Sequence, residues 1–460
     1  MSKKRHLNHG PEGSVSCSGK PITLKGERVA KFTRKSAWAV LALVATLGDD
    51  VSTARTKDEL FEQSPISAAA NTVPPKPYES PDANWMVDVQ LPTMGKIVPG
   101  AEDLLDRLPK GVDRERLVQF DAQCRQWFAE AERDLSELEG GEARQRRIFD
   151  YLERVINAYA QAVGVKWTGR MEMGSDQFVI QMQKVNSILL PFGNYMHAEY
   201  NPSDGARMTL YRANRQASTT FGGQKVPLLY LTDGPSLRSV PRSEKAYFNG
   251  MYNPQSGIAY FDENGSVYQF KKMIGHHRVR CESQKIVPRT LNLAKAKEGW
   301  IRDFETHEAA HSYFNQRIPY NPNVGLDLRG KVAIPMGRYE LPAILFATSS
   351  QAQLHELFAN AIGLMESGGS AVLAAHSIAT TRVTGEEMVN YKLASDVLFF
   401  EVMNCPDLDE PLRSQIKSEL AQAQKVDLNK MAVAIDRLSD ESLHRIGKRM
   451  AKLALYLTQE

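Results

Sequence analysis

The chain of 460 residues is poor in cysteine, and no two of its four cysteines are close in sequence: Cys17, Cys124, Cys281 and Cys405. This spacing excludes a Cys-x-x-Cys metal knuckle and argues against a disulfide-stapled scaffold, so we expect buried or free thiols. The chain also lacks internal repeats, and beyond residue 54 it lacks any apolar run long enough to span a bilayer. We therefore expect no integral membrane domain beyond an N-terminal leader.

A strong excess of charge is missing as well. The formal net charge is +3, and residues 1–54 carry nine Lys and Arg against four Asp and Glu, which leaves −2 for the remainder. Residues 55–460 are so close to neutral that they lack the excess of positive charge typical of nucleic-acid-binding proteins, so we expect no nucleic-acid partner. Apolar residues make up 42% and charged residues 24%, which is ordinary for a globular protein with a core of normal size.

The N-terminal part combines positive charge with a short apolar run. Residues 36–48 are uncharged and mostly apolar, and Lys31, Arg34 and Lys35 precede them. Such a run is too short to span a bilayer but suits the core of a signal peptide, and residues 52–54 are small enough for cleavage. Residues 1–54 therefore predict a leader and a periplasmic or secreted protein. The alternative is a cytoplasmic protein in which this run is a buried helix.

Composition and periodicity divide the rest of the chain. Residues 55–100 are rich in proline and predict an extended linker. Apolar residues recur at helical spacing on both sides of Gly140-Gly141, which predicts a helical hairpin over 101–165. We assign 166–405 to a catalytic domain and 406–460 to C-terminal helices, an α+β fold with a small mixed or antiparallel sheet.

Within 170–275 short runs of branched and aromatic residues predict strands at 178–180, 208–211 and 226–231. Residues 258–261, then Asn264-Gly265, then 267–270 predict a β-hairpin, because Asn-Gly favours a tight turn. Beyond residue 290 the pattern is helical. We expect a helix over 296–316, a helix from Ser350 to Gly368 with Gln353 as capping-box partner, a helix from Thr384, and further helices over 407–458.

The strongest chemical signal is His307-Glu308-Ala309-Ala310-His311, inside the predicted helix over 296–316. Residues four apart lie one turn apart on the same helix face, so both imidazoles can bind one Zn²⁺. Glu308 lies beside them and can accept a proton from a water that the metal makes acidic. His307 and His311 are therefore candidate ligands, and Glu308 is the candidate general base. The competing interpretation is an exposed helix with incidental histidines.

A catalytic zinc usually has three protein ligands. Glu356 follows His311 by 45 residues on the next predicted helix, and Asn360 lies one turn further on. There the Asn360 side-chain oxygen can accept the free ring N–H of a ligand histidine. His-Glu-x-x-His with a downstream Glu on a helix resembles the gluzincin peptidases, the zincin group that includes thermolysin. The run Glu356, Ala359, Asn360, Gly363-Leu364 is similar to the Glu-x-x-Ala-Asp and Gly-Leu of HtpX-type members, with Asn in place of Asp.

This resemblance implies a zincin-like domain, a Zn²⁺ cofactor, Glu356 as third ligand and Asn360 as a supporting residue. It also implies an edge strand beside the metal-binding helix, on which an extended peptide substrate adds, and residues 257–262 are our candidate. The usual zincin helix has uncharged residues just before the motif, whereas this chain has Glu305. The family's oxyanion-stabilising residue has several candidates here: Tyr320, Tyr339, His376 and Tyr391.

We therefore predict a zinc-dependent peptidase acting on peptides or proteins. One alternative is a noncatalytic cell-envelope or partner-binding protein, against which the intact Glu308 argues. The other is a zinc hydrolase of a non-peptide amide, which the sequence does not separate from a peptidase. His276-His277 predict a surface or loop position, and His355 predicts a packing role. Nothing in the sequence indicates the oligomeric state.

Overall fold

The computed structural model describes residues 89–100, 103–166, 176–201, 205–240, 248–321, 324–326, 349–380, 389–423 and 428–458. All of them belong to one compact unit, Ser36–Glu460, whereas the unit Met1–Lys35 lies outside the described residues. The predicted leader over 1–54, most of the predicted linker, Tyr339 and the helix start expected at Thr384 also lie outside them.

The described strands form one sheet in the order β1-β3-β4-β6-β5, and β2 pairs with the first part of β3. Their bounds are β1 Val98–Pro99, β2 Asn194–Asn201, β3 Gly205–Phe221, β4 Gln224–Arg238, β5 Gly250–Asn253 and β6 Ile258–Asp262. All pairings are antiparallel except that of β4 with β6, which is parallel. The sheet is therefore mixed, and together with the helices it confirms an α+β fold.

Both faces of the sheet are buried. Successive side chains of a strand point to opposite faces, so alternate residues of β4 enter different cores. Leu228 and Tyr230 belong to the core shared with the helices that carry the predicted zinc motif. Leu229 and Leu231 belong to a separate aromatic cluster on the opposite face. Burial on both faces explains why β4 reads as a continuous apolar run.

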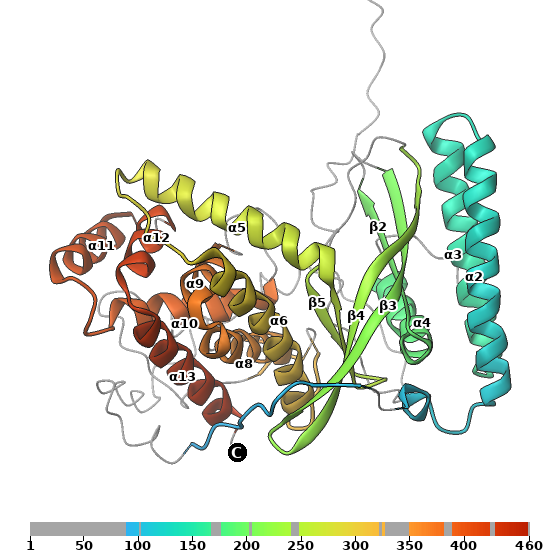
Figure 1. Ribbon diagram of the computed structural model, residues 1–460, viewed down its shortest axis with the longest axis horizontal. Coiled ribbons are helices and arrows are strands. Elements are labelled where there is room, and N and C mark those ends of the chain that lie inside the picture. Colours follow the sequence, from blue (N-terminus) through green and yellow to red (C-terminus); the bar gives the residue numbers. More distant parts are fainter. Residues whose placement is uncertain are drawn as a thin grey trace, which may run out of the picture. The chain divides into compact units, whose positions relative to one another are not determined.

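Three described α-helices lie between β1 and β2 in the chain: α2 Arg114–Glu137, α3 Gly141–Ala162 and α4 Asp176–Leu189. Helices α2 and α3 contact each other and both contact β4, beside which they lie in Figure 1. The strand predicted at 178–180 is wrong, because these residues lie within α4. The apolar residues of α4 recur at helical spacing and enter the core with α2 and α3: Phe178, Met182, Val185, Ile188 and Leu189.

The predicted β-hairpin over 258–270 is also wrong in its second half. Strand β6 ends at Asp262, and α5 Glu263–Ser283 follows at once. The Asp262 carboxylate accepts a hydrogen bond from the backbone N–H of Asn264 at 3.1 Å, so Asp262 caps the helix. Gly265 is required by a close approach, since a Cβ there would lie 1.9 Å from the Phe248 carbonyl oxygen. The Asn-Gly pair thus begins a helix instead of making a turn.

The remaining helices are α6 Leu293–Asn315, α8 Gln351–Glu366, α9 Ala371–Thr380, α10 Lys392–Met403, α11 Glu410–Ala423, α12 Leu428–Arg437 and α13 Asp440–Leu457. The capping box predicted for α8 is confirmed, with Ser350 and Gln353 bonded to each other's backbone N–H. Helix α5 extends from the sheet to α12 (Figure 1). In the part of the chain that is described, no single helix qualifies by length and hydropathy as a membrane span, although α8 and residues 368–380 do so as a pair bent by 113°.

Candidate metal centre

Helix α6 carries the His-Glu-x-x-His motif and is buried on several sides. Asn292 caps its N-terminus by accepting from the Lys295 backbone N–H. Ala309 and Ala310 are fully buried in the main core, as expected of small residues that pack against the sheet. Glu305, the unexpected charge, accepts a 2.5 Å hydrogen bond from the Tyr230 hydroxyl of β4. The carboxyl of Glu305 therefore anchors the helix to the sheet and is not one of the candidate metal ligands.

Two glycines let α6 and α8 approach closely. A Cβ at Gly299 of α6 would lie 2.0 Å from the carbonyl oxygen of Ser367, which follows α8. A Cβ at Gly363 of α8 would lie 2.2 Å from the Asp303 carboxylate of α6. No larger residue fits at either place without displacing the Ser367 backbone or the Asp303 carboxylate. This contact sets the two helices side by side, with Glu356 opposite the histidines of the motif.

The side chains of three candidate ligand residues converge between these helices. The Nε2 atoms of His307 and His311 are 3.2 Å apart. Oε2 of Glu356 lies 3.6 Å from His307 Nε2, and Oε1 lies 3.7 Å from His311 Nε2. Atoms bound to one tetrahedral zinc at about 2.0–2.2 Å are separated by about 3.3–3.5 Å. The three residues are buried, and their spacing fits a single metal ion.

The electrostatics of the cluster fit a cation better than ion pairs among its members. Burial lowers the pKa of His307 to about 4 and holds the pKa of His311 well below its usual value. Burial also raises the pKa of Glu356 to about 8. Neutral imidazoles cannot form salt bridges with Glu356, but each has a lone pair for a metal. A bound cation would offset the desolvation of the carboxylate.

Glu308 lies beside His307, one of the three candidate ligands. Its Oε1 lies 4.0 Å from His307 Nε2, and its Oε2 is buried with no hydrogen-bond partner. Burial, and secondarily the charge of Glu356, raises the pKa of Glu308 well above its usual value. A carboxyl with a raised pKa and a vacant acceptor beside a candidate metal site has the properties of a general base.

Asn360 does not bond a ligand histidine as predicted; it bonds Glu356 instead. The Asn360 amide donates to Oε2 of Glu356 at 3.3 Å and to its backbone carbonyl at 2.8 Å, so it contacts the carboxylate and not a histidine ring. Tyr320 donates to Oε1 of Glu356 at 3.3 Å, and Asn390 donates to the Tyr320 hydroxyl at 3.3 Å. Tyr391 also hydrogen-bonds Glu356, which favours ionisation and so works against the burial that raises its pKa. The carboxylate is therefore oriented by residues from three segments.

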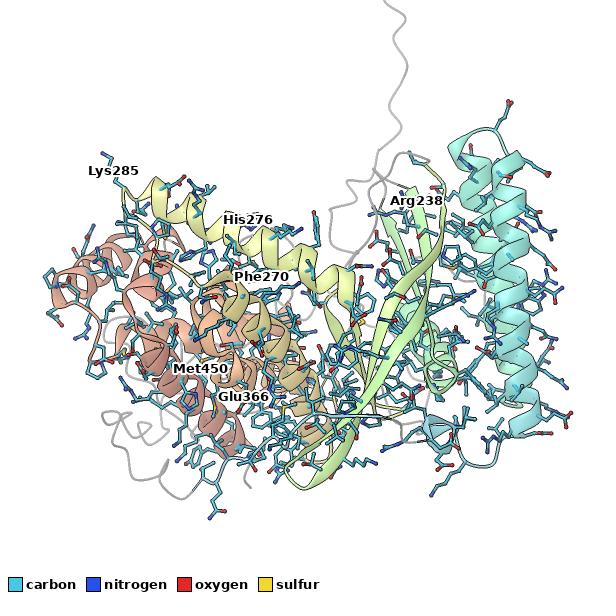
Figure 2. The ribbon with its side chains drawn as sticks, viewed as in Figure 1. Arg238, Phe270, His276, Lys285, Glu366 and Met450 are labelled. Atoms are coloured by element: carbon cyan, nitrogen blue, oxygen red, sulfur yellow. The ribbon has the colours of Figure 1, made fainter. Side chains whose placement is uncertain are left out.

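Other histidines separate into two places. His355 packs as expected, with its ring stacked 5.7 Å from that of His311 and its Nε2 2.5 Å from the Ile318 carbonyl oxygen. His276 is exposed on α5, as Figure 2 labels it, but His277 is buried, which corrects the surface position expected for the pair. His277, Cys281 and Asp436 form a second buried group that can hold a metal ion. His376, an expected oxyanion candidate, lies against His277 instead of Glu356.

The second group has a sequence signal that motif searching passes over. His277 and Cys281 are four apart on one helix, the same spacing as His307 and His311. The third member, Asp436, lies 155 residues beyond Cys281 and has no motif of its own. The expectation of free thiols is confirmed for the described cysteines Cys124, Cys281 and Cys405, whereas Cys17 lies outside the described residues.

Comparisons with protein-family models, with curated proteins and with solved structures found no match for this chain.

Proposed function

We propose that this protein is a zinc-dependent peptidase of the gluzincin type, with His307, His311 and Glu356 as ligands and Glu308 as general base. The observation that carries the proposal is the convergence of the three ligand side chains from α6 and α8 beside Glu308. Zinc suits two imidazoles and one carboxylate with a remaining open position, the ligand set of hydrolytic sites. Intact Glu308 favours a catalyst over a noncatalytic binding protein.

A bound zinc ion supplies Lewis acidity and lowers the pKa of a coordinated water towards 7. The chain's own residues do the remaining work. The vacant Oε2 of Glu308 accepts the proton of the attacking water and later delivers it to the leaving amine. Tyr320, Asn360 and Tyr391 hold Glu356 in the ligating orientation through hydrogen bonds to its carboxylate. Burial keeps both histidines neutral and so able to ligate.

Strand β5 supports a peptide as the substrate. The edge strand predicted at residues 257–262 is wrong, because β6 lies between β4 and β5. Strand β5 is the last described strand on this side of the sheet. Gly250 of β5 lies next to the base, since a Cβ there would be 3.2 Å from Glu308 Cγ. The backbone N–H of Asp262 donates to the carbonyl oxygen of Asn249. In an antiparallel pair every second residue points its backbone N–H and C=O at the partner strand, so those of Gly250 and Tyr252 point away from β6. An extended peptide pairing there would pass beside Glu308.

The test compares zinc content and hydrolysis in three variants of the full-length protein. Glu308→Gln should keep zinc and lower the rate of peptide hydrolysis by about 10²–10⁴-fold, because it removes the base and no ligand. Glu356→Ala should lose about one equivalent of zinc together with the activity. Glu366→Gln is the matched control, since this residue of α8 is partly exposed and pairs with Arg302 at the surface. Peptide-library digestion followed by mass spectrometry measures activity.

Each part of the proposal can fail separately. Full zinc content in Glu356→Ala would move the third ligand elsewhere and remove the gluzincin assignment. An unchanged rate in Glu308→Gln would remove the assigned base. A zinc-loaded protein that cleaves simple amides but no peptide would favour the non-peptide hydrolase.

The apolar run over 36–48 leads us to propose export to the periplasm or the medium. Mass spectrometry of the natural protein should show loss of about the first 50 residues. Intact Met1 in a soluble cytosolic fraction would contradict export.

A further inference from the structure

A second cluster of ligand-type side chains lies where α5, α9 and α12 contact one another. His277 Nε2 is 3.0 Å from the Asp436 Oδ1 and 3.7 Å from the Cys281 Sγ. The side chains of His277 and Asp436 are 3% and 6% exposed, and Cys281 is fully buried. One nitrogen, one sulfur and one oxygen thus converge in an enclosed place.

The distances fit coordination of one ion. With Zn–S at about 2.3 Å and Zn–N at about 2.0 Å, tetrahedral geometry separates sulfur and nitrogen by about 3.5 Å. The Cys281–His277 contact of 3.7 Å is close to this value. Their positions four apart on α5 place both side chains on the same face of the helix.

His376 of α9 supplies a second, independent observation. It is fully buried, and neither of its ring nitrogens has a hydrogen-bond partner. Its ring meets that of His277 edge-on, with centroids 5.4 Å apart. A buried imidazole with both nitrogens unpaired is costly, and metal ligation satisfies one of them. His376 lies outside the group of His277, Cys281 and Asp436, whose ligand atoms are all within 4.8 Å of one another, so its ring would have to approach them to serve as a fourth ligand.

We propose that His277, Cys281, Asp436 and His376 form a structural zinc site, separate from the one between α6 and α8. The ligand chemistry selects zinc, because a thiolate with imidazoles suits Zn²⁺ better than Mg²⁺ or Ca²⁺. One thiolate and one carboxylate balance the two positive charges of the ion, which suits a buried place. Four protein ligands leave no open position, as is usual for structural and not catalytic zinc.

Such a site would link three segments that are distant in sequence. Residues 277–281, 376 and 436 come from α5, α9 and α12, and α9 packs against both α6 and α8. The metal would therefore brace the helices that carry His307 and Glu356 without contacting substrate. It is independent of the proposed hydrolytic activity, and its test does not require any activity.

The test is cobalt substitution of the metal-free full-length protein. A thiolate ligand gives Co²⁺ an intense near-ultraviolet sulfur-to-metal absorption, which a site of two histidines and one glutamate cannot give. We expect this band in the unaltered protein and in Glu356→Ala, and its loss in Cys281→Ser. Zinc content should fall from about two equivalents to about one in Cys281→Ser, in His277→Ala and in Glu356→Ala alike.

Neighbouring residues provide matched controls. His276→Ala, on the exposed side of α5, and Cys124→Ser, a buried thiol of α2, should keep both equivalents and the band. His376→Ala should weaken zinc binding measurably, and full affinity in that variant would overturn its assignment as a ligand.

Absence of the sulfur-to-cobalt band in the unaltered protein would overturn this second site, whether or not metal binds at His307, His311 and Glu356. Because Glu356→Ala leaves Cys281 in place, the same measurement on that variant decides the question even if Cys281→Ser fails to fold. In Glu356→Ala, added zinc should also raise the unfolding temperature. No rise would count against the site.

Discussion

Tyr320→Phe isolates one hydroxyl beside the predicted third ligand. The ring of Tyr320 packs against His311 and His355, with centroids 5.9 Å and 5.1 Å away, and phenylalanine retains both contacts. Only the hydrogen bond to Oε1 of Glu356, at 3.3 Å, and the one accepted from Asn390 are removed. Any change in zinc binding therefore reports on the orientation of Glu356.

We expect zinc affinity to fall about 10- to 100-fold, the usual effect of removing a group that orients a metal ligand. This equals about 1.4–2.7 kcal/mol at 1.36 kcal/mol per tenfold. Half of the carboxylate keeps its donor, because Asn360 still bonds Oε2, so the lower end of the range is the expected one. Asn390 loses an acceptor but is only partly buried, which limits the additional cost to folding.

The assay is competition for zinc with a chromogenic chelator, followed by hydrolysis rates at saturating zinc. Tyr151→Phe is the control, because it also removes a buried tyrosine hydroxyl bond, to the Cys124 carbonyl, in a different core. Zinc affinity within twofold of the unaltered protein would refute the reasoning. A lower rate at saturating zinc would instead assign Tyr320 to the reaction itself.

Three further predictions concern the same helices. Asn360→Ala should weaken zinc binding about tenfold in the competition assay, because it removes the donor to the other oxygen of Glu356; unchanged affinity would make that contact incidental. Burial raises the pKa of Glu356 to about 8 and lowers that of His307 to about 4. Between about pH 5 and 8, Glu356 is therefore the one proposed ligand that must lose a proton when zinc binds. Zinc affinity should therefore rise about tenfold per pH unit up to about pH 8 and then level off, and a pH-independent affinity by titration calorimetry would contradict this. Ser350→Ala should lower the free energy of unfolding by about 0.5–2 kcal/mol in urea, because it removes the capping box of α8, whereas Ser350→Thr should retain most of it.

The sequence alone determined those features that depend only on neighbouring residues in the chain. The spacing of His307 and His311 requires only that residues 296–316 be helical, and α6 covers nearly that range. The capping box of Ser350 and Gln353 is likewise a local interaction, and it is present at the start of α8. Both follow from backbone geometry within a few residues, so neither depends on the rest of the fold.

Tertiary structure decided the features that depend on distant partners. Asn264-Gly265 is compatible with a turn or a helix start, and the capping carboxylate of Asp262 and the close approach of Phe248 select the helix. The approach of α6 to α8 through Gly299 and Gly363 brings Glu356 to the histidines across a segment of 45 residues. Asp436 meets His277 and Cys281 only because α12 packs on α5. Sequence spacing carries no information about such meetings, because they depend on how helices pack in three dimensions.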